Sequence, residues 1–192
     1  MPRVSFYKPN SKNTGAAFSA NFKGSELYFN IVKQASWNDS NRRASFKENV
    51  KNPQKSLAVK INTTEAANII LAMETKGKYS TYHKSKNQNL NINFELMMDK
   101  QTDTEKGFSL RILKEDVANS VDKISFSMGF YFAEGLILKA FLNEFIVSSF
   151  FVENTDPEQE PQGGNEDRPQ QAQAQAQAPK ESKKPETQND DW

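Results

Sequence analysis

The feature that most constrains the fold of this chain is a regular alternation of apolar and polar residues. In the segment 27–31, Leu27, Phe29 and Ile31 alternate with residues that can face solvent. The same alternation marks 92–98, 108–112 and 124–128. A period of two is typical of β-strands with one buried face. The pattern therefore predicts sheets that each cover one side of a core.

The predicted strands come in two rounds, and each round ends in a helix. The first round comprises strands at 18–22, 27–31, 45–50 and 57–61 and a helix at 66–76. The second comprises strands at 78–86, 92–98, 108–112 and 124–128 and a helix at 131–148. An offset of 67 residues aligns the rounds, setting Leu27 against Phe94 and Ile70 against Ile137. We expect an α+β fold with two pseudo-repeated four-stranded antiparallel sheets, each followed by a helix (ββββα-ββββα).

The ends of the first predicted helix carry recognisable signals. Thr63, Thr64 and Glu65 place hydroxyl groups and one acid at its start. Hydroxyl side chains can accept hydrogen bonds from the first free amides, and an acid in the first turn complements the helix dipole. Gly77 predicts the end of the helix, because glycine readily adopts the left-handed conformation found there.

Composition divides the chain into three parts. Residues 1–14 are basic and polar and predict a flexible basic arm or an irregular edge segment. Residues 15–152 contain the strand and helix patterns and are enough for one folded domain with a real core. Residues 153–192 contain five prolines and a run of alternating Gln and Ala. This last part cannot bury enough apolar area to offset the entropy lost on ordering, so we expect a disordered tail.

Charge follows the same division. Residues 1–152 contain 21 Lys and Arg against 14 Asp and Glu, a net charge of +7. Residues 153–192 contain 4 against 10, a net charge of −6. A basic domain joined to an acidic tail indicates a polyanionic partner for the domain. The alternative is a tail that only keeps an ordinary domain in solution.

Several classes of protein are disfavoured by composition. The absence of cysteine excludes disulfides and thiolate metal sites. His83, the one histidine, would have to serve any metal site or catalytic triad alone, so a surface or base-stacking role is the better interpretation. We expect no enzyme activity, no metal and no cofactor. No signal peptide or membrane span is expected, which favours the cytoplasm of a bacterium or an infected host cell.

Two segments combine cations with flat rings, as binding of a single-stranded nucleic acid requires. The first is the predicted strand 78–86, and the second is the loop and strand at 37–47. The alternatives are an edge strand protected by lysines and a tryptophan that folds back over the core. The residues that we expect to contact a nucleic acid are Trp37, Arg42, Arg43, Phe46, Lys47, Lys60, Lys78, Tyr79, Tyr82, Lys84, Lys86 and Arg111.

The order of strands and helices resembles the Whirly family and its relatives around the transcriptional positive cofactor 4 fold. The local likeness is in the closing helix, Phe132–Phe145, and in the segment Phe22–Leu27. In the latter, Ser25 and Glu26 stand where that family has Lys and Ala. The resemblance covers about residues 15–150. It implies binding of single-stranded DNA along sheet surfaces and edges, with little sequence preference, and assembly into dimers or tetramers.

The tail ends in Asp190, Asp191 and Trp192. A linker rich in Gln and Pro that ends in acids and an aromatic residue is similar to bacterial and phage single-stranded DNA-binding proteins. Those commonly end in Phe, where this chain has Trp192. The resemblance implies a role in DNA replication, recombination or repair, in which Asp190, Asp191 and Trp192 bind partner enzymes. A viral or bacterial source suits this combination.

Three interpretations remain open at this point. The helix at 131–148 carries apolar residues around nearly all of its circumference, so it is buried either against a second copy of the chain or within the monomer. An RNA-binding module is one alternative to DNA binding, since mitochondrial guide-RNA-binding proteins share the fold that the resemblance implies. A protein–protein adaptor that binds through its sheets is the other.

Overall fold

The computed structural model describes residues 1–117 and 123–152. Its elements in chain order are β1 (Arg3–Lys8), β2 (Ala16–Lys23), β3 (Glu26–Lys33), β4 (Ser36–Asn38), β5 (Arg43–Ser45), the 3-10 turn η1 (Lys47–Asn49), β6 (Ser56–Ile61), α1 (Thr63–Thr75), β7 (Lys78–Lys84), β8 (Gln88–Met98), β9 (Glu105–Asp116), β10 (Lys123–Tyr131) and α2 (Phe132–Val152).

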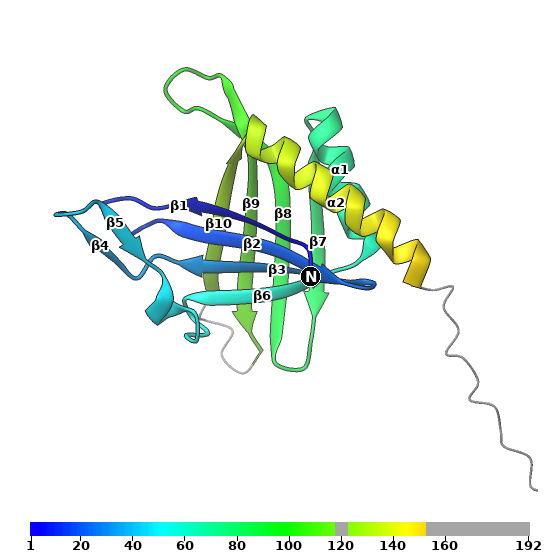
Figure 1. Cartoon of the computed structure of the whole chain (residues 1–192), viewed down its shortest axis with the longest axis horizontal. Helices are drawn as coiled ribbons and strands as arrows, with labels where there is room; N and C mark the ends of the chain where they lie inside the picture. Colours follow the sequence, from blue (N-terminus) through cyan, green and yellow to red (C-terminus); the bar gives the residue numbers. More distant parts are fainter. Residues whose placement is uncertain (118–122, 153–192) are drawn as a thin grey trace, which may run out of the picture. The chain divides into compact units, whose positions relative to one another are not determined.

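Two four-stranded sheets dominate the described residues. The first sheet has the order β1-β2-β3-β6, the second has the order β10-β9-β8-β7, and neighbouring strands in both are antiparallel. A helix follows the last strand of each sheet, and the strands of the two sheets run across one another (Figure 1). This confirms an α+β fold of antiparallel sheets and two helices. A two-stranded hairpin, β4–β5, interrupts the first round.

The inner faces of the two sheets share one core because their alternating residues are apolar and point toward each other. Phe18 on β2 lies opposite Ile31 on β3, and both are buried. The Phe18 ring also packs edge-on against Phe130 of the second sheet, with centroids 5.1 Å apart. Phe22 packs against Phe145 of α2 at 5.6 Å. Sheets and helix α2 therefore bury their apolar faces in a common interior.

Helix α1 begins one residue after an asparagine cap. The Oδ1 atom of Asn62 accepts a hydrogen bond from the Glu65 amide at 2.8 Å, and Glu65 in turn accepts one from the Asn62 amide at 3.0 Å. This reciprocal pair satisfies two amides that the helix itself cannot. The predicted acid in the first turn is confirmed, but the cap is Asn62. Lys76, with φ of 53°, takes the left-handed position, and Gly77 follows it.

Helix α2 has one buried side and one exposed side. Leu138, Leu142 and Phe145 are buried, whereas Leu136 and Val147 are largely exposed. The described residues of the monomer thus leave part of this apolar helix uncovered. No helix in residues 1–117 and 123–152 combines the length and apolarity needed to span a membrane.

Three expectations for local structure were wrong. Part of the segment 1–14 is the edge strand β1, because Phe6 is buried opposite Phe18 while its polar neighbours face out. The predicted strand 45–50 is mostly the turn η1, in which the Val50 amide bonds to the Lys47 carbonyl at 3.3 Å. The offset of 67 aligns β3 with β8, but along the chain β3 is the third strand of its sheet and β8 is the second of its own, so the offset does not describe the repeat.

Candidate nucleic-acid interface

The outward side of the first sheet carries polar, aromatic and basic side chains in rows across the strands. We define the first-sheet face as the residues that alternate with the buried ones on β1, β2, β3 and β6. One row consists of Arg3, Asn21, Tyr28 and Lys60, which the strand register sets side by side. Such a row spans the sheet, with an aromatic ring between two cations.

The middle of the first-sheet face is hollow because its side chains are small. Ser5, Ser19, Asn30 and Ala58 form the next row. A shallow cavity of about 350 Å³ lies over this part of the face. It is lined by Arg3, Ser19, Asn21, Asn30, Val32, Val50, Ser56, Leu57 and Ala58. The side-chain amide of Asn30 donates to Asn21 Oδ1 at 3.0 Å, so the lining combines a hydrogen-bonded polar pair with apolar side chains.

A groove beside the edge of the first sheet brings together two of the predicted lysines. It has a volume of about 180 Å³ and lies between β6 and the turn from β7 to β8. Lys60 comes from the first sheet, and His83 and Lys84 come from β7 of the second sheet. The sequence places Lys60 and Lys84 more than twenty positions apart, yet the fold brings both to the lining of one groove.

Lys60 is also held by an acid. Its Nζ donates to Oε1 of Glu26 at 2.7 Å. The hydrogen bond from Lys60 and its positive charge lower the pKa of Glu26, and the hydrogen bond to Glu26 raises the pKa of Lys60. Both groups are solvent-exposed, so this pair adds little to stability and is accessible to a competing phosphate.

The outward side of the second sheet carries most of the predicted strand. Lys78, Ser80, Tyr82 and Lys84 alternate outward on β7, and the Tyr82 side chain is 56% exposed. We define the second-sheet face as these residues and their outward neighbours on β8, β9 and β10. Ser80, Asn93 and Arg111 form one row of this face. Arg111 therefore shares a surface with Tyr82, as its position on a predicted strand suggested.

Tyr79, which we expected to contact a nucleic acid, does not belong to this face. It alternates with the exposed residues and points to the side covered by α1, where it packs against the core. Burial is the main cause of its raised pKa. His83 also points to that side and contacts Glu65 Oε1 at 2.6 Å. Lys86 is exposed, but it lies in the turn after β7.

The second predicted segment forms the β4–β5 hairpin and the turn η1. Trp37 on β4 is half-buried opposite Ala44, and its Nε1 donates to Asp39 at 2.8 Å. Arg42 adopts φ of 52° in the hairpin turn, and Arg43 begins β5. Lys47 follows in η1 and is exposed. These cations are thus presented on a short hairpin beside the first sheet.

Phe46 connects the hairpin to the first-sheet face. Its ring contacts that of Tyr7 on β1, with centroids 6.1 Å apart. Tyr7 lies four residues from Arg3, roughly 13 Å along an extended strand. The first-sheet face therefore runs between the hairpin at one end and the groove of Lys60 and Lys84 at the other.

Sequence reasoning missed the centre of this surface. Tyr28 and Asn30 were on the polar side of an alternating strand, but nothing along the chain showed which strands would flank them. Arg3 and Tyr7 were not predicted as part of the interface, because their segment was not expected to form a strand of the sheet. Asp190, Asp191 and Trp192 lie outside the described residues. Among the residues that the structure describes, no three His, Asp or Glu side chains are grouped to hold a metal ion.

The domain has an α+β fold of two crossed antiparallel sheets, with a helix after the last strand of each. No family model matches the sequence, and no curated protein matches it. A solved structure with a similar fold is titled "Crystal structures of trypanosoma bruciei MRP1/MRP2". The TM-score is 0.53 at 15% identity, over 76% of this chain and 83% of that chain. At this identity the likeness concerns the fold.

Proposed function

We propose that the domain binds single-stranded DNA with little sequence preference. The observation that carries the proposal is the first-sheet face, which has tyrosines and a shallow cavity on it and cations at both ends. Binding of this kind needs cations that follow the phosphates and rings on which bases stack. The surface offers both.

The path of the strand follows from the position of the cations. Arg42, Arg43 and Lys47 contact phosphates at the hairpin, and Lys60 and Lys84 contact them at the groove. Between these ends, the small side chains of the cavity leave room for bases to lie against the sheet. Tyr7 and Tyr28 provide rings along this path, and Tyr82 extends it onto the second-sheet face. Little sequence preference follows because every base has a face that can stack.

The proposed biological role combines the domain with the tail. The domain protects single-stranded DNA during replication, recombination or repair, without enzyme activity of its own, and the chain acts as a homo-oligomer. Asp190, Asp191 and Trp192 recruit partner enzymes. A chain that ends at Val152 would then bind DNA more tightly at low salt, because the acidic tail no longer competes for the cations, and would lose its partners. If the shortened chain bound DNA and the partner enzymes as the full chain does, the proposed role of the tail would be refuted.

The test of DNA binding is a titration of fluorescently labelled oligo(dT) with the full chain at several salt concentrations. We expect Tyr28→Ala to weaken binding roughly 5- to 150-fold, the range of one lost stacking contact. Lys60→Ala should lower the slope of log affinity against log salt by about 0.7, as expected for one phosphate contact on a single strand. Lys106→Ala, a lysine on β9 paired with Asp99, serves as the matched control.

Two further ligands separate the alternatives. A titration with poly(U) at the same salt concentration tests for a preference for RNA. Such a preference requires a group that contacts the 2′-hydroxyl. A duplex of the same length reports binding by charge alone. Tighter binding of poly(U) than of oligo(dT) would replace DNA with RNA as the ligand. Oligo(dT) that remains free at low salt, in the presence of folded protein, would refute nucleic-acid binding by this domain.

A further inference from the structure

The side of α2 that faces away from the core is almost entirely apolar. Leu136 is 68% exposed, Val147 is 56% exposed and Phe151 is 71% exposed. At 100° per residue, Leu136, Ala140 and Val147 lie along one line of the helix, opposite the buried Leu142. We call the exposed side the α2 stripe, and its members are Phe132, Ala133, Leu136, Ile137, Ala140, Asn143, Glu144, Val147, Phe150 and Phe151.

The α2 stripe is large enough for a protein interface. Its six large apolar residues are between 39% and 71% exposed. With aromatic side chains of roughly 150–250 Å² each, they present on the order of 600 Å² of apolar surface. Patches of this size on a monomer mark interaction sites, and a standard interface covers about 800 Å² per partner. Burial of the stripe would therefore supply most of one such interface.

The composition of the helix favours a protein partner over a lipid surface. Helices that lie on membranes carry Lys and Arg beside their apolar face. The one lysine of α2 is Lys139, and its Nζ is paired with Glu74 Oε1 at 2.8 Å. An acid, Glu144, lies within the stripe itself.

The α2 stripe is also complementary to the same stripe of a second copy when the two helices pack antiparallel. Leu136 lies near its start and Val147 near its end, with the small Ala140 between them. A two-fold axis through the middle of the stripe sets Leu136 of each copy against Val147 of the other, because an isologous contact is reciprocal. Ala140 then lies where the helices cross and lets them approach closely, within the usual 8–10 Å.

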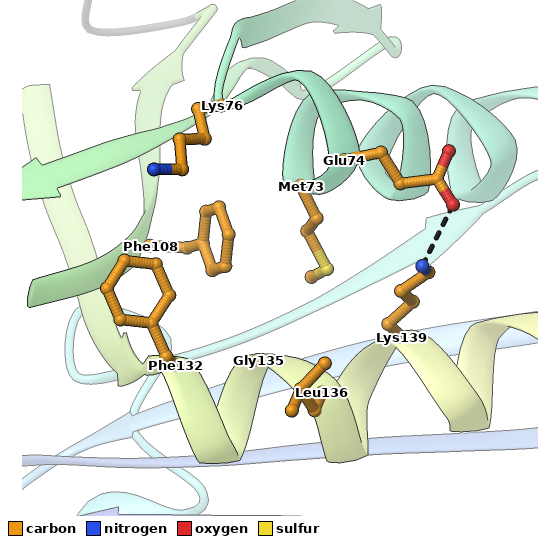
Figure 2. A pocket seen from close by; sticks show the side chains of 8 residues that line it. All are labelled: Met73, Glu74, Lys76, Phe108, Phe132, Gly135, Leu136 and Lys139. Atoms are coloured by element: carbon orange, nitrogen blue, oxygen red, sulfur yellow. Dashed lines mark ion pairs between the residues drawn. The ribbon is translucent and has the colours of Figure 1, made fainter. Parts of the chain in front are cut away.

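An apolar pocket at the start of α2 supports the antiparallel direction. It has a volume of about 280 Å³ and is bordered by Met73, Phe108, Phe132 and Leu136. Figure 2 shows the rings of Phe108 and Phe132 on one side of the pocket and Leu136 beneath it. An antiparallel copy brings the aromatic end of its own α2, with Phe151, to this end of the helix. A parallel copy would instead bring the start of its own α2, where Phe132 is the one aromatic residue of the first two turns.

We infer that two copies of this chain pair through the α2 stripe in an antiparallel arrangement, with Leu136 of one copy against Val147 of the other. This pairing specifies the surface of the proposed homo-oligomer, but it does not depend on nucleic-acid binding. The residues of the stripe are distinct from those of the first-sheet and second-sheet faces. Both faces therefore remain available in the paired form.

Engineered cysteines test the pairing directly, because the chain has none of its own. In the full chain, the double variant Leu136→Cys/Val147→Cys should form a disulfide-linked dimer on mild oxidation. The two cysteines of one copy are eleven residues apart on a helix, about 16 Å, too far to bridge each other. Each single variant should remain unlinked, since equivalent residues are equally far apart in the antiparallel pair. A parallel pair would link the single variants instead.

The mass in solution provides the second measurement. We expect the wild-type chain to be at least a dimer by light scattering at micromolar concentration, and Leu136→Glu to be a monomer with an unchanged circular dichroism spectrum. Val50→Glu, which adds the same charge at an exposed apolar residue outside α2, should keep the wild-type mass. A monomeric wild-type chain would overturn the inference. So would a double variant that is linked no faster than Leu136→Cys/Ala58→Cys, whose second cysteine lies on the first-sheet face.

Discussion

Lys60 on β6 donates a hydrogen bond from its Nζ to Oε1 of Glu26 on β3, with the two atoms 2.7 Å apart. The pair lies on the outward side of the first sheet, beside the groove that also contains Lys84. In the absence of a ligand, Glu26 therefore holds a cation that the proposed function assigns to phosphate.

Replacement of this acid should strengthen binding. In Glu26→Gln, Lys60 loses its charged partner and a nearby phosphate loses a repulsive neighbour, so we expect oligo(dT) to bind about two- to five-fold tighter at low salt. Because the pKa of Glu26 lies below its usual value, acid should produce the same gain only at a pH below the range in which an ordinary glutamate takes up its proton.

The matched control for this prediction is Glu105→Gln. That change removes the same charge from another exposed pair, with Lys76, away from the first-sheet face. Equal gains in the two variants would mean that only the net charge matters. The proposed contact between Lys60 and phosphate would then be wrong.

Two tyrosines on one strand should behave in opposite ways. Tyr82 faces outward and Tyr79 faces α1. We expect Tyr82→Ala to weaken oligo(dT) binding by about 1–3 kcal/mol with an unchanged melting temperature. Tyr79→Ala should lower the melting temperature and leave the affinity of the folded protein as it was. Calorimetry and fluorescence titration of both variants measure the two effects, and the reverse result would contradict the orientation of β7.

The buried carboxylate of Glu65 should be important for stability. It accepts hydrogen bonds from the Asn62 amide and from Thr81 Oγ1, and it contacts His83 Nε2. Glu65→Ala leaves these groups without their partner, so we expect a loss of about 2–3 kcal/mol in the free energy of unfolding, measured with urea. Glu74→Ala, an exposed acid on the same helix, should cost less than about 1 kcal/mol. Similar losses would contradict the proposed role of Glu65.

Lys33 should make stability depend on alkaline pH. Burial lowers its pKa, with a contribution from the nearby charge of Lys55. The folded protein then loses this proton at a lower pH than the unfolded chain, so the cost of the partly buried charge on Lys33 decreases as the pH rises. We expect Lys33→Met to melt about 1–3 °C higher at pH 7, with a smaller difference at pH 10. Lys23→Met, at an exposed lysine, should show no such trend.

The alternation along the chain was enough to predict most strands of the second sheet. Leu27, Phe29 and Ile31 likewise identified β3, because a half-buried strand needs apolar residues at every second position. Strand β1 could not be recognised this way, since it is short and contributes one fully buried side chain, Phe6. Its strand character comes from pairing with β2, a contact that no local pattern encodes.

The candidate site was predicted only where its residues are neighbours in sequence. Tyr82 and Lys84 were found because both the rings and the charges lie within one strand. Which face of β7 is covered depends on the packing of α1. Alternation along the chain cannot predict this, because both faces of the strand carry polar side chains and a tyrosine. The row of Arg3, Tyr28 and Lys60 requires strands from three parts of the chain.

Glu65 has one more consequence, which concerns geometry. The same carboxylate caps the helix that follows β6 and contacts His83, the residue before Lys84. It thereby links the strand that carries one groove lysine to the strand that carries the other. An acid outside the groove lining would in this way fix how far apart the two groove lysines lie.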